Sequence, residues 1–291
     1  MERPGPAGPV RRAPTHPAGA RYFGETSMTT LFCRRAWLGA SLVLAIAPAL
    51  SAADALRVRV VTYNIHHGEG TDGKLDLERI AAVIQRLEPD LVALQEVDVG
   101  TTRSQGVDQA AELGRLTGLQ AAFGKAMDYA GGQYGGALLS RWPLEDVQTH
   151  GLPYEAGCEP RCAVAARVCP PGDPRRFVFA ATHLEHQNAT VRLCQAGKLA
   201  PYLADTGGLP VLVAGDFNAV PGSPPLTVLR RHWADAAEGK WAPTCPAAQP
   251  DATLDYVFYR PANAWRVVET QVIEEPVASD HRPVLAVLEL P

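Results

Sequence analysis

The chain has 291 residues, of which 46% are hydrophobic and 20% charged, so it is long enough for one large globular domain or two small ones. No segment repeats at a fixed period, which excludes a solenoid or a propeller. The formal net charge of −4 speaks against a protein that binds nucleic-acid phosphates along a long basic surface.

The N-terminal region differs in composition from the rest. Residues 1–27 are rich in Pro, Gly and Arg without apolar periodicity, so we expect them to be disordered or to precede the true start of the protein. Residues 28–53 are typical of a secretory signal peptide: a basic start with Arg34 and Arg35, an apolar run, and then small residues. The paired arginines also resemble the twin-arginine export signal. An uncleaved anchor is the alternative interpretation.

We therefore expect residues 54–291 to form the mature domain, periplasmic or secreted and without a stable membrane span. Without residues 1–52 the chain keeps 21 Lys and Arg against 29 Asp and Glu, a net charge near −8. Five cysteines remain, and Cys158 and Cys162 are the pair expected to form a disulfide in an oxidising compartment. We expect the domain to be a monomer.

Apolar and β-branched runs predict the strands. They are expected at 57–65, 91–96, 121–129, 136–142, 162–169, 176–184, 211–218, 253–259, 265–273 and 283–290. A flexible glycine-rich turn at 131–135 is expected to join the third and fourth.

Amphipathic patterns predict helices at 77–87, 107–117, 188–204 and 226–231. Asp76 is the expected N-cap of the first, and Pro201 is expected to kink the third. Asn188-Ala189-Thr190 matches a glycosylation acceptor, but we interpret it as a helix start. Strands outnumber helices and come in two batches, each with helices, which favours two packed sheets with helices outside.

Polar residues follow the apolar strands at six places. They are Asn64, Glu96, His183, Asp216 with Asn218, Asp255, and Asp280 with His281. In the stretch 211–218, side chains two apart on an extended segment point the same way, so Asp216 and Asn218 should share one rim of a sheet while Phe217 turns into the core. A carboxylate and an amide there suit phosphate chemistry, because one holds a cation or accepts a proton and the other donates to a phosphoryl oxygen.

The adjacent histidines His66 and His67 lie in the loop after the first strand. We interpret them as hydrogen-bonding residues or as residues at the edge of a substrate site, with metal ligation as the alternative.

The motifs TYN, QE, THL, GDFN, LDYVF and SDHRP occur in this order over residues 57–290. Together they resemble the endonuclease/exonuclease/phosphatase superfamily. The resemblance implies a deoxyribonuclease I-like α/β fold, a four-layer α/β/β/α sandwich of two packed, mainly antiparallel sheets. It also implies metal-dependent hydrolysis of a phosphate ester.

The resemblance also implies roles for individual residues. Glu96 and Asp280 would be the main Mg²⁺ or Mn²⁺ ligands with Asn64 in support, and Asp216 and Asn218 would orient water and phosphate. The remaining roles concern proton transfer and the substrate: His281 with Asp255 as base or phosphate-polarising group, His183 as a phosphate contact, and Arg103 and Tyr134 as substrate-side groups.

The chain direction supports one of these pairings. Asp280 and His281 are consecutive and point apart in an extended chain, so the carboxylate that orients His281 must come from elsewhere, and Asp255 is available. One departure concerns Gly136, where related sequences commonly carry Asn or another side chain, so no contact is expected from that position.

The expected function is that of an exported phosphodiesterase or phosphatase acting on a lipid head group or small phosphoester. A DNA or RNA endonuclease is the alternative within the family. A binding module that has lost catalysis is the alternative outside enzymes, but all expected metal ligands and His281 are present.

Overall fold

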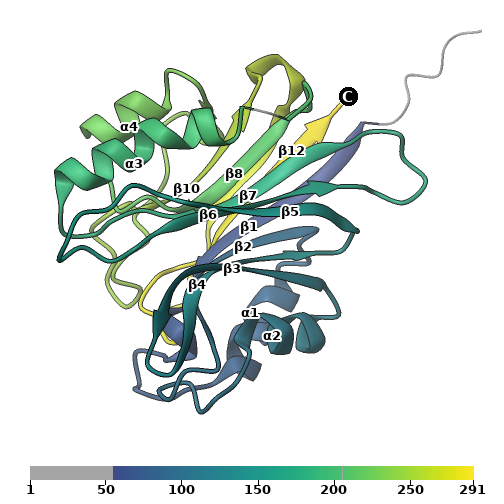
Figure 1. The fold of residues 1–291 in the computed structure, drawn as a ribbon. Coiled ribbons are helices and arrows are strands. Elements are labelled where there is room, and N and C mark those ends of the chain that lie inside the picture. The colour runs from purple at the N-terminus through teal and green to yellow at the C-terminus, as the bar shows by residue number, and fades with distance from the viewer. Residues whose placement is uncertain (1–54, 205) are drawn as a thin grey trace, which may run out of the picture. The chain divides into compact units, whose positions relative to one another are not determined.

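Two six-stranded sheets form the centre of the computed structural model, which describes residues 55–204 and 206–291 (Figure 1). The first sheet has the order β11 (Arg266–Val272), β12 (Val284–Leu290), β1 (Leu56–Asn64), β2 (Leu91–Val99), β4 (Gly132–Ser140), β3 (Gln120–Tyr129). The second has the order β5 (Leu144–Gly151), β6 (Cys162–Val168), β7 (Phe177–His183), β8 (Val211–Asp216), β10 (Asp255–Arg260), β9 (Ala234–Asp235).

Each sheet contains one parallel pair of strands, and the other pairings are antiparallel. In the first sheet β1 runs parallel to β2, and α1 (Leu77–Arg86) lies between them in the chain. In the second sheet β7 runs parallel to β8, with α3 (Ala189–Tyr202) between them. Both connections are the crossover helices that parallel neighbours require. Carboxyl ends of two parallel strands therefore meet at one edge of each sheet.

The helices cover the outer faces of the sheets. In Figure 1, α1 and α2 (Gln109–Thr117) lie beside the first sheet, and α3 and α4 (Pro224–Leu229) beside the second. The predicted α/β/β/α sandwich with mainly antiparallel sheets is confirmed.

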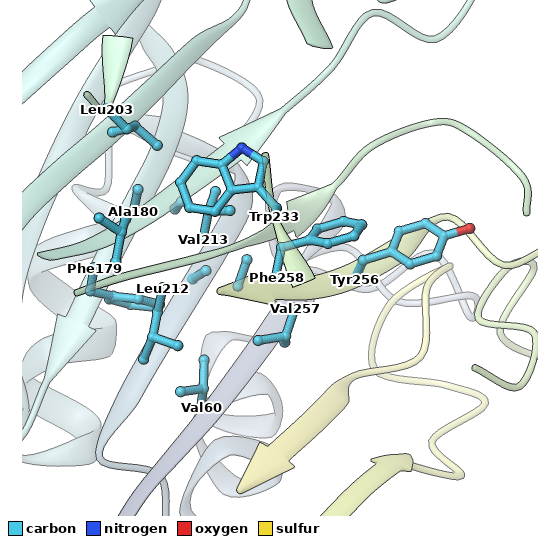
Figure 2. Packing of buried hydrophobic residues seen from close by; sticks show 14 of the residues in the cluster. Val60, Phe179, Ala180, Leu203, Leu212, Val213, Trp233, Tyr256, Val257 and Phe258 are labelled. Atoms are coloured by element: carbon cyan, nitrogen blue, oxygen red, sulfur yellow. The ribbon is translucent and has the colours of Figure 1, made fainter. Parts of the chain in front are cut away.

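The core lies between the sheets and under the helices. Along β1, Val58 and Val60 belong to the cluster shared with the second sheet, whereas Val61 and Tyr63 belong to the cluster beneath α1 and α2. Figure 2 shows Val60 near Leu212 and Val257, on the face of the second sheet that is turned toward the first. Phe258, Val213 and Trp233 lie together on the opposite face. Both faces of β1 are therefore buried, which explains its nearly continuous apolar run.

Two predicted boundaries were wrong in ways that affect the site, and one strand was not predicted. Strand β2 continues past Glu96 to Val99. Strand β4 begins at Gly132, so the turn is shorter than 131–135 and Tyr134 is a strand residue. The glycines do not interrupt this strand, because they allow the neighbouring strand β3 to approach closely. A Cβ on Gly135 would lie 2.0 Å from the Gly124 oxygen. Strand β5 was not predicted because it is an exposed edge strand whose largely polar sequence lacks an apolar run.

Two helix starts agree with the predicted capping residues. The side chain of Asp76 accepts from the Arg79 N–H, and that of Asn188 accepts from the Thr190 and Val191 N–H groups. Pro201 lies in the last turn of α3. The predicted helix at 107–117 begins two residues later, at Gln109.

The predicted disulfide is wrong. Cys158 and Cys162 are both free. Cys162 starts β6 and is buried, with its Sγ directed at the Gly124 oxygen (3.4 Å), whereas Cys158 lies in the preceding loop. Burial raises the pKa of the Cys162 thiol to about 11.

The segments 1–27 and 28–53 lie outside the described residues, as does the predicted domain start at residue 54. Among the helices that the structure describes, none has both the length and the apolarity to cross a membrane. Residues 55–204 and 206–291 belong to one compact unit.

Candidate active site

Three neighbouring strands of the second sheet each deliver one polar residue to the same level. In the strand register, His183 pairs with Asp216 and Asp216 pairs with Asp255. All three are buried, and each lies an even number of residues from the apolar side chains that face the first sheet. The three side chains thus enter the space between the two sheets at one rim of the sandwich.

Asp216 is the centre of this cluster. Its Oδ1 accepts from the Asn218 N–H (2.8 Å), and its Oδ2 accepts from Asn64 Nδ2 (3.2 Å). The same Oδ2 lies 3.4 Å from His183 Nε2 and 3.8 Å from His281 Nε2. Burial, and secondarily the Asp255 carboxylate, raises the pKa of Asp216 to about 7. Phe217 is fully buried, as predicted, while Asn218 turns back beside Asp216.

Glu96 reaches the cluster through a β-bulge. The pairing of β2 with β4 shifts between Gln95 and Val97, and Glu96 has a φ of 58°. In a regular strand Glu96 would share the face of Leu94 and point under the helices. The bulge turns it into the cleft instead, where Asn64 Nδ2 donates to its Oε1 (3.1 Å).

His281 and Asp255 form a hydrogen-bonded pair, as predicted from chain direction. His281 Nδ1 lies 2.9 Å from Asp255 Oδ2, and both residues are buried. Burial would lower the pKa of His281, but the carboxylates of Asp255 and Asp216 outweigh it and raise that pKa. The preceding Ser279 donates through Oγ to the Asn64 carbonyl (2.7 Å), which ties the His281 loop to the end of β1.

Arg161 organises the opposite wall of the cleft, and the sequence analysis missed it. It is buried, and its Nη1 donates to Tyr134 Oη (3.1 Å) and to His183 Nδ1 (2.8 Å). Its Nη2 lies 3.2 Å from His186 Nδ1, and the Glu159 carboxylate forms an ion pair with Nη1 at 2.9 Å. A guanidinium only donates, so His183 Nδ1 must accept and Nε2 carries the proton.

His183 Nε2 faces two polar groups. It lies 3.4 Å from Asp216 Oδ2, to which it can donate, and 3.0 Å from the side-chain amide of Asn218, whose Nδ2 donates to the Leu184 carbonyl (3.0 Å). Burial, with the charge of Arg161, lowers the pKa of His183 well below its ordinary value, so its ring is neutral. The side chains of His183 and Asn218 both border the cleft.

The predicted substrate-side residues lie in this cleft, which has a volume of about 370 Å³. Tyr134 projects from β4 and is 5% exposed. Arg103 makes a two-pronged ion pair with buried Asp98 (2.7 and 2.8 Å) and stacks over Tyr129 at 4.6 Å. Gly136, the position of the expected departure, does not line this cleft.

The residues expected to hold a divalent cation offer hard oxygen donors in one place. Glu96 and Asp280 line the same cleft as Asp216, and Asn64 links Glu96 to Asp216. Burial and, second, the neighbouring Asp255 carboxylate raise the pKa of Asp216, so a cation bound nearby would stabilise its ionised form. Carboxylate and amide oxygens fit Mg²⁺ or Mn²⁺. The residue roles drawn from the resemblance stay predictions.

Comparisons with known proteins identify relatives along most of the chain. Residues 61–281 match the Endonuclease/Exonuclease/phosphatase family. A relative in Escherichia coli (strain K12), "Uncharacterized protein YbhP", is 28% identical over 245 residues, which cover 80% of this chain and 96% of the relative.

Solved structures of the same family share the fold. The endonuclease/exonuclease/phosphatase from Beutenbergia cavernae DSM 12333 is 28% identical with a TM-score of 0.65, covering 80% of this chain and 72% of the other. The structure from Bacteroides vulgatus is 21% identical with a TM-score of 0.68, covering 81% and 100%. The chain therefore belongs to the endonuclease/exonuclease/phosphatase family of phosphoester hydrolases.

Proposed function

We propose that this protein is an exported, divalent-metal-dependent hydrolase of a small phosphoester or a phospholipid head group. The observation that carries the proposal is the cluster of Asp216, Asp255 and His281 facing Asn64 and Glu96 across the rim of the sandwich. It combines a carboxylate able to take a proton, a charged imidazole and oxygen ligands for a cation in one cleft.

Asp216 is the residue we assign to activate the water. Its pKa of about 7 allows the carboxylate to accept a proton near neutral pH. Asn218 and His183 present Nδ2–H and Nε2–H to the phosphoryl oxygens from beside it. A divalent cation held by Glu96 and Asp280, with Asn64 in support, would neutralise charge that develops on the phosphoryl group.

His281 acts as the phosphate-polarising group in this proposal rather than as the base. Its raised pKa keeps the ring protonated at neutral pH, with Nδ1–H donated to Asp255. The second proton, on Nε2, is then available to a phosphoryl or leaving-group oxygen. Of the two roles expected from the sequence, the geometry supports this one.

The size and charge of the cleft favour a small substrate. Acidic side chains, among them Glu96, Glu159 and Asp280, border it, and its two arginines are already paired with acids. A long nucleic-acid backbone would meet few uncompensated positive charges here.

The test is hydrolysis by residues 54–291 with Mg²⁺ or Mn²⁺. Candidate substrates are sphingomyelin, inositol phosphates, a chromogenic phosphodiester, plasmid DNA and RNA, with His281→Ala as the control for contaminating activity. We expect metal-dependent turnover of a lipid head group or small phosphoester. Preferred cleavage of plasmid DNA or RNA would replace the proposal by the endonuclease alternative, and no turnover of any substrate would favour a binding module.

Export is tested separately. The full-length gene product, expressed in a Gram-negative bacterium, should appear in the periplasm or medium with an N-terminus near Asp54, as read by mass spectrometry. Retention of residues 28–50 on a protein in the cytosol would contradict this part of the proposal.

A further inference from the structure

Two residues that line the cleft, His66 and Glu96, and the buried His67 behind them bring metal-binding atoms together. Their ligand atoms lie within 4.8 Å of one another, and the two imidazole rings are 4.5 Å apart. We propose that they form a second cation site, selective for a transition metal such as Zn²⁺, beside the oxygen site for Mg²⁺ or Mn²⁺. Glu96 would serve both sites.

The hydrogen bonds of the two rings place their lone pairs suitably. His66 Nδ1 lies 3.1 Å from the Glu69 carbonyl oxygen, an acceptor, so Nδ1 carries the proton and Nε2 has the lone pair. His67 Nε2 lies 3.5 Å from the Glu69 carboxylate, which favours a proton on Nε2 and a lone pair on Nδ1. Metal-binding histidines almost always donate their other N–H to a carbonyl or carboxylate in this way.

His67 supplies a second, independent observation. The residue is 8% exposed, and its Nδ1 is buried without any hydrogen-bond partner. An imidazole nitrogen left bare in this way costs free energy unless something binds to it. A cation held with Glu96 would satisfy it.

The backbone holds all three residues in an uncommon conformation. His66, His67 and Glu96 have φ angles of 45°, 45° and 58°, in the left-handed region that side chains other than glycine rarely adopt. Helix α2 helps to fix the loop, because Gln109 Nε2 donates to the His67 carbonyl (2.6 Å). Strain of this kind collects where a ligand site needs a particular geometry.

The donor set determines which cation the site would take. Two imidazole nitrogens and one carboxylate suit Zn²⁺ and leave a position open for water or substrate. Mg²⁺ prefers oxygen ligands and would remain at the oxygen site. With metal–ligand bonds of about 2.0–2.2 Å, neighbouring ligand atoms come to within roughly 3.5 Å, so the side chains need to close in slightly on binding.

The experiment measures metal binding, and its outcome does not depend on whether a substrate is known. Residues 54–291, which contain both sheets and the core, are titrated with Zn²⁺ by calorimetry in excess Mg²⁺, and with Co²⁺ by visible absorption. We expect one Zn²⁺ to bind, and Co²⁺ to show ligand-field bands without the thiolate charge-transfer bands that cysteine ligands would add.

Variants identify the ligands. His66→Ala, at a half-buried position, and His67→Gln should each weaken Zn²⁺ binding at least about tenfold while Mg²⁺ binding is retained. His186→Ala is the matched control, since His186 borders the same cleft but bonds to Arg161. If His67→Gln does not fold, as judged by circular dichroism, His66→Ala decides alone. Unchanged Zn²⁺ affinity in His66→Ala, or an equal loss in His186→Ala, would overturn the proposal.

Discussion

Asp216 and Asp255 lie directly opposite each other on the antiparallel strands β8 and β10, with both carboxyl groups buried. Two acids at one level of a sheet are stable only with compensation, and His281 supplies it from 2.9 Å on one side and 3.8 Å on the other. The cluster is thus a charge-balanced unit whose protonation depends on pH.

The first prediction concerns stability and pH. Asp216 has a pKa of about 7 in the folded protein, above the ordinary value of 3.8, so the folded state holds this proton more tightly than the unfolded state. Its contribution to stability is therefore present at acid pH and is lost as pH rises through about 7. Replacing Asp216 by Asn removes this pH-dependent loss. The difference in free energy of unfolding between Asp216→Asn and the wild type should therefore be about 1–4 kcal/mol more favourable to the variant at pH 8.5 than at pH 5.

The measurement is urea denaturation of both proteins at the two pH values, in chelator so that no cation contributes. Asp251→Asn, a change of an exposed acid, is the control and should show no such difference. An equal effect of Asp216→Asn at pH 5 and pH 8.5 would show that the carboxyl group titrates normally.

The second prediction concerns the cation. Glu96→Gln keeps the shape of the side chain and removes the charge, so we expect kcat/KM with Mg²⁺ to fall by about 10²- to 10³-fold, since the lost metal stabilisation is worth several kcal/mol. Calorimetry should show weaker Mg²⁺ binding as well. Glu159→Gln, which also borders the cleft but pairs with Arg161, should bind Mg²⁺ as the wild type does. Full activity of the wild type in chelator would contradict metal dependence.

The sequence was sufficient to predict most of one rim of the sandwich. Asn64, His183 and Asp216 end their strands, and parallel neighbours bring such ends together, so a pattern of polar residues after apolar runs locates the site. The same rule also selected Glu96, although its strand does not end there. Strand β2 continues to Val99, and a bulge at Glu96 turns the side chain into the cleft.

Arg161 could not be found by that rule because it precedes a strand. Strand β6 runs antiparallel to β7, with Ala163 opposite Thr182, so the beginning of β6 lies beside the end of β7 and brings Arg161 to His183. Recognising this requires the pairing of strands, which periodicity does not reveal. The same applies to the cysteines: their spacing suggested a bond, but Cys162 begins β6 with its Sγ directed at the Gly124 oxygen, and both thiols are free.

The third prediction concerns Arg161. Arg161→Lys keeps the charge but cannot reach Tyr134, His183 and His186 together, so the proton on His183 is no longer confined to Nε2. We expect kcat/KM to fall about 10- to 100-fold, since charged hydrogen bonds contribute about 1.5–3 kcal/mol each. The nitrogen chemical shifts of the His183 ring, measured by NMR, should move from a single tautomer toward a mixture.

Arg167→Lys is the matched control, because Arg167 lies on β6, the strand that Arg161 precedes, and pairs with Asp146 at the surface. It should change neither kcat/KM nor the His183 shifts. If Arg161→Lys lowers activity but leaves those shifts unchanged, Arg161 contacts the substrate and does not set the tautomer of His183.

The final prediction is that His281 and Asp255 act as one unit. Asp255 contacts the His281 ring through a 2.9 Å hydrogen bond, so its contribution to catalysis should vanish once the imidazole is gone. Since positioned proton-transfer groups contribute about 10²- to 10⁴-fold, His281→Ala should lower kcat/KM by that order, and Asp255→Asn by a similar or smaller factor. The double variant should be little worse than His281→Ala alone, because groups that act together are strongly non-additive.

The measurement is a double-mutant cycle on whichever phosphoester is cleaved, with folding checked by circular dichroism. Fully additive losses would mean that Asp255 works independently of the histidine, for instance on the cation, and the pair would have to be reassigned.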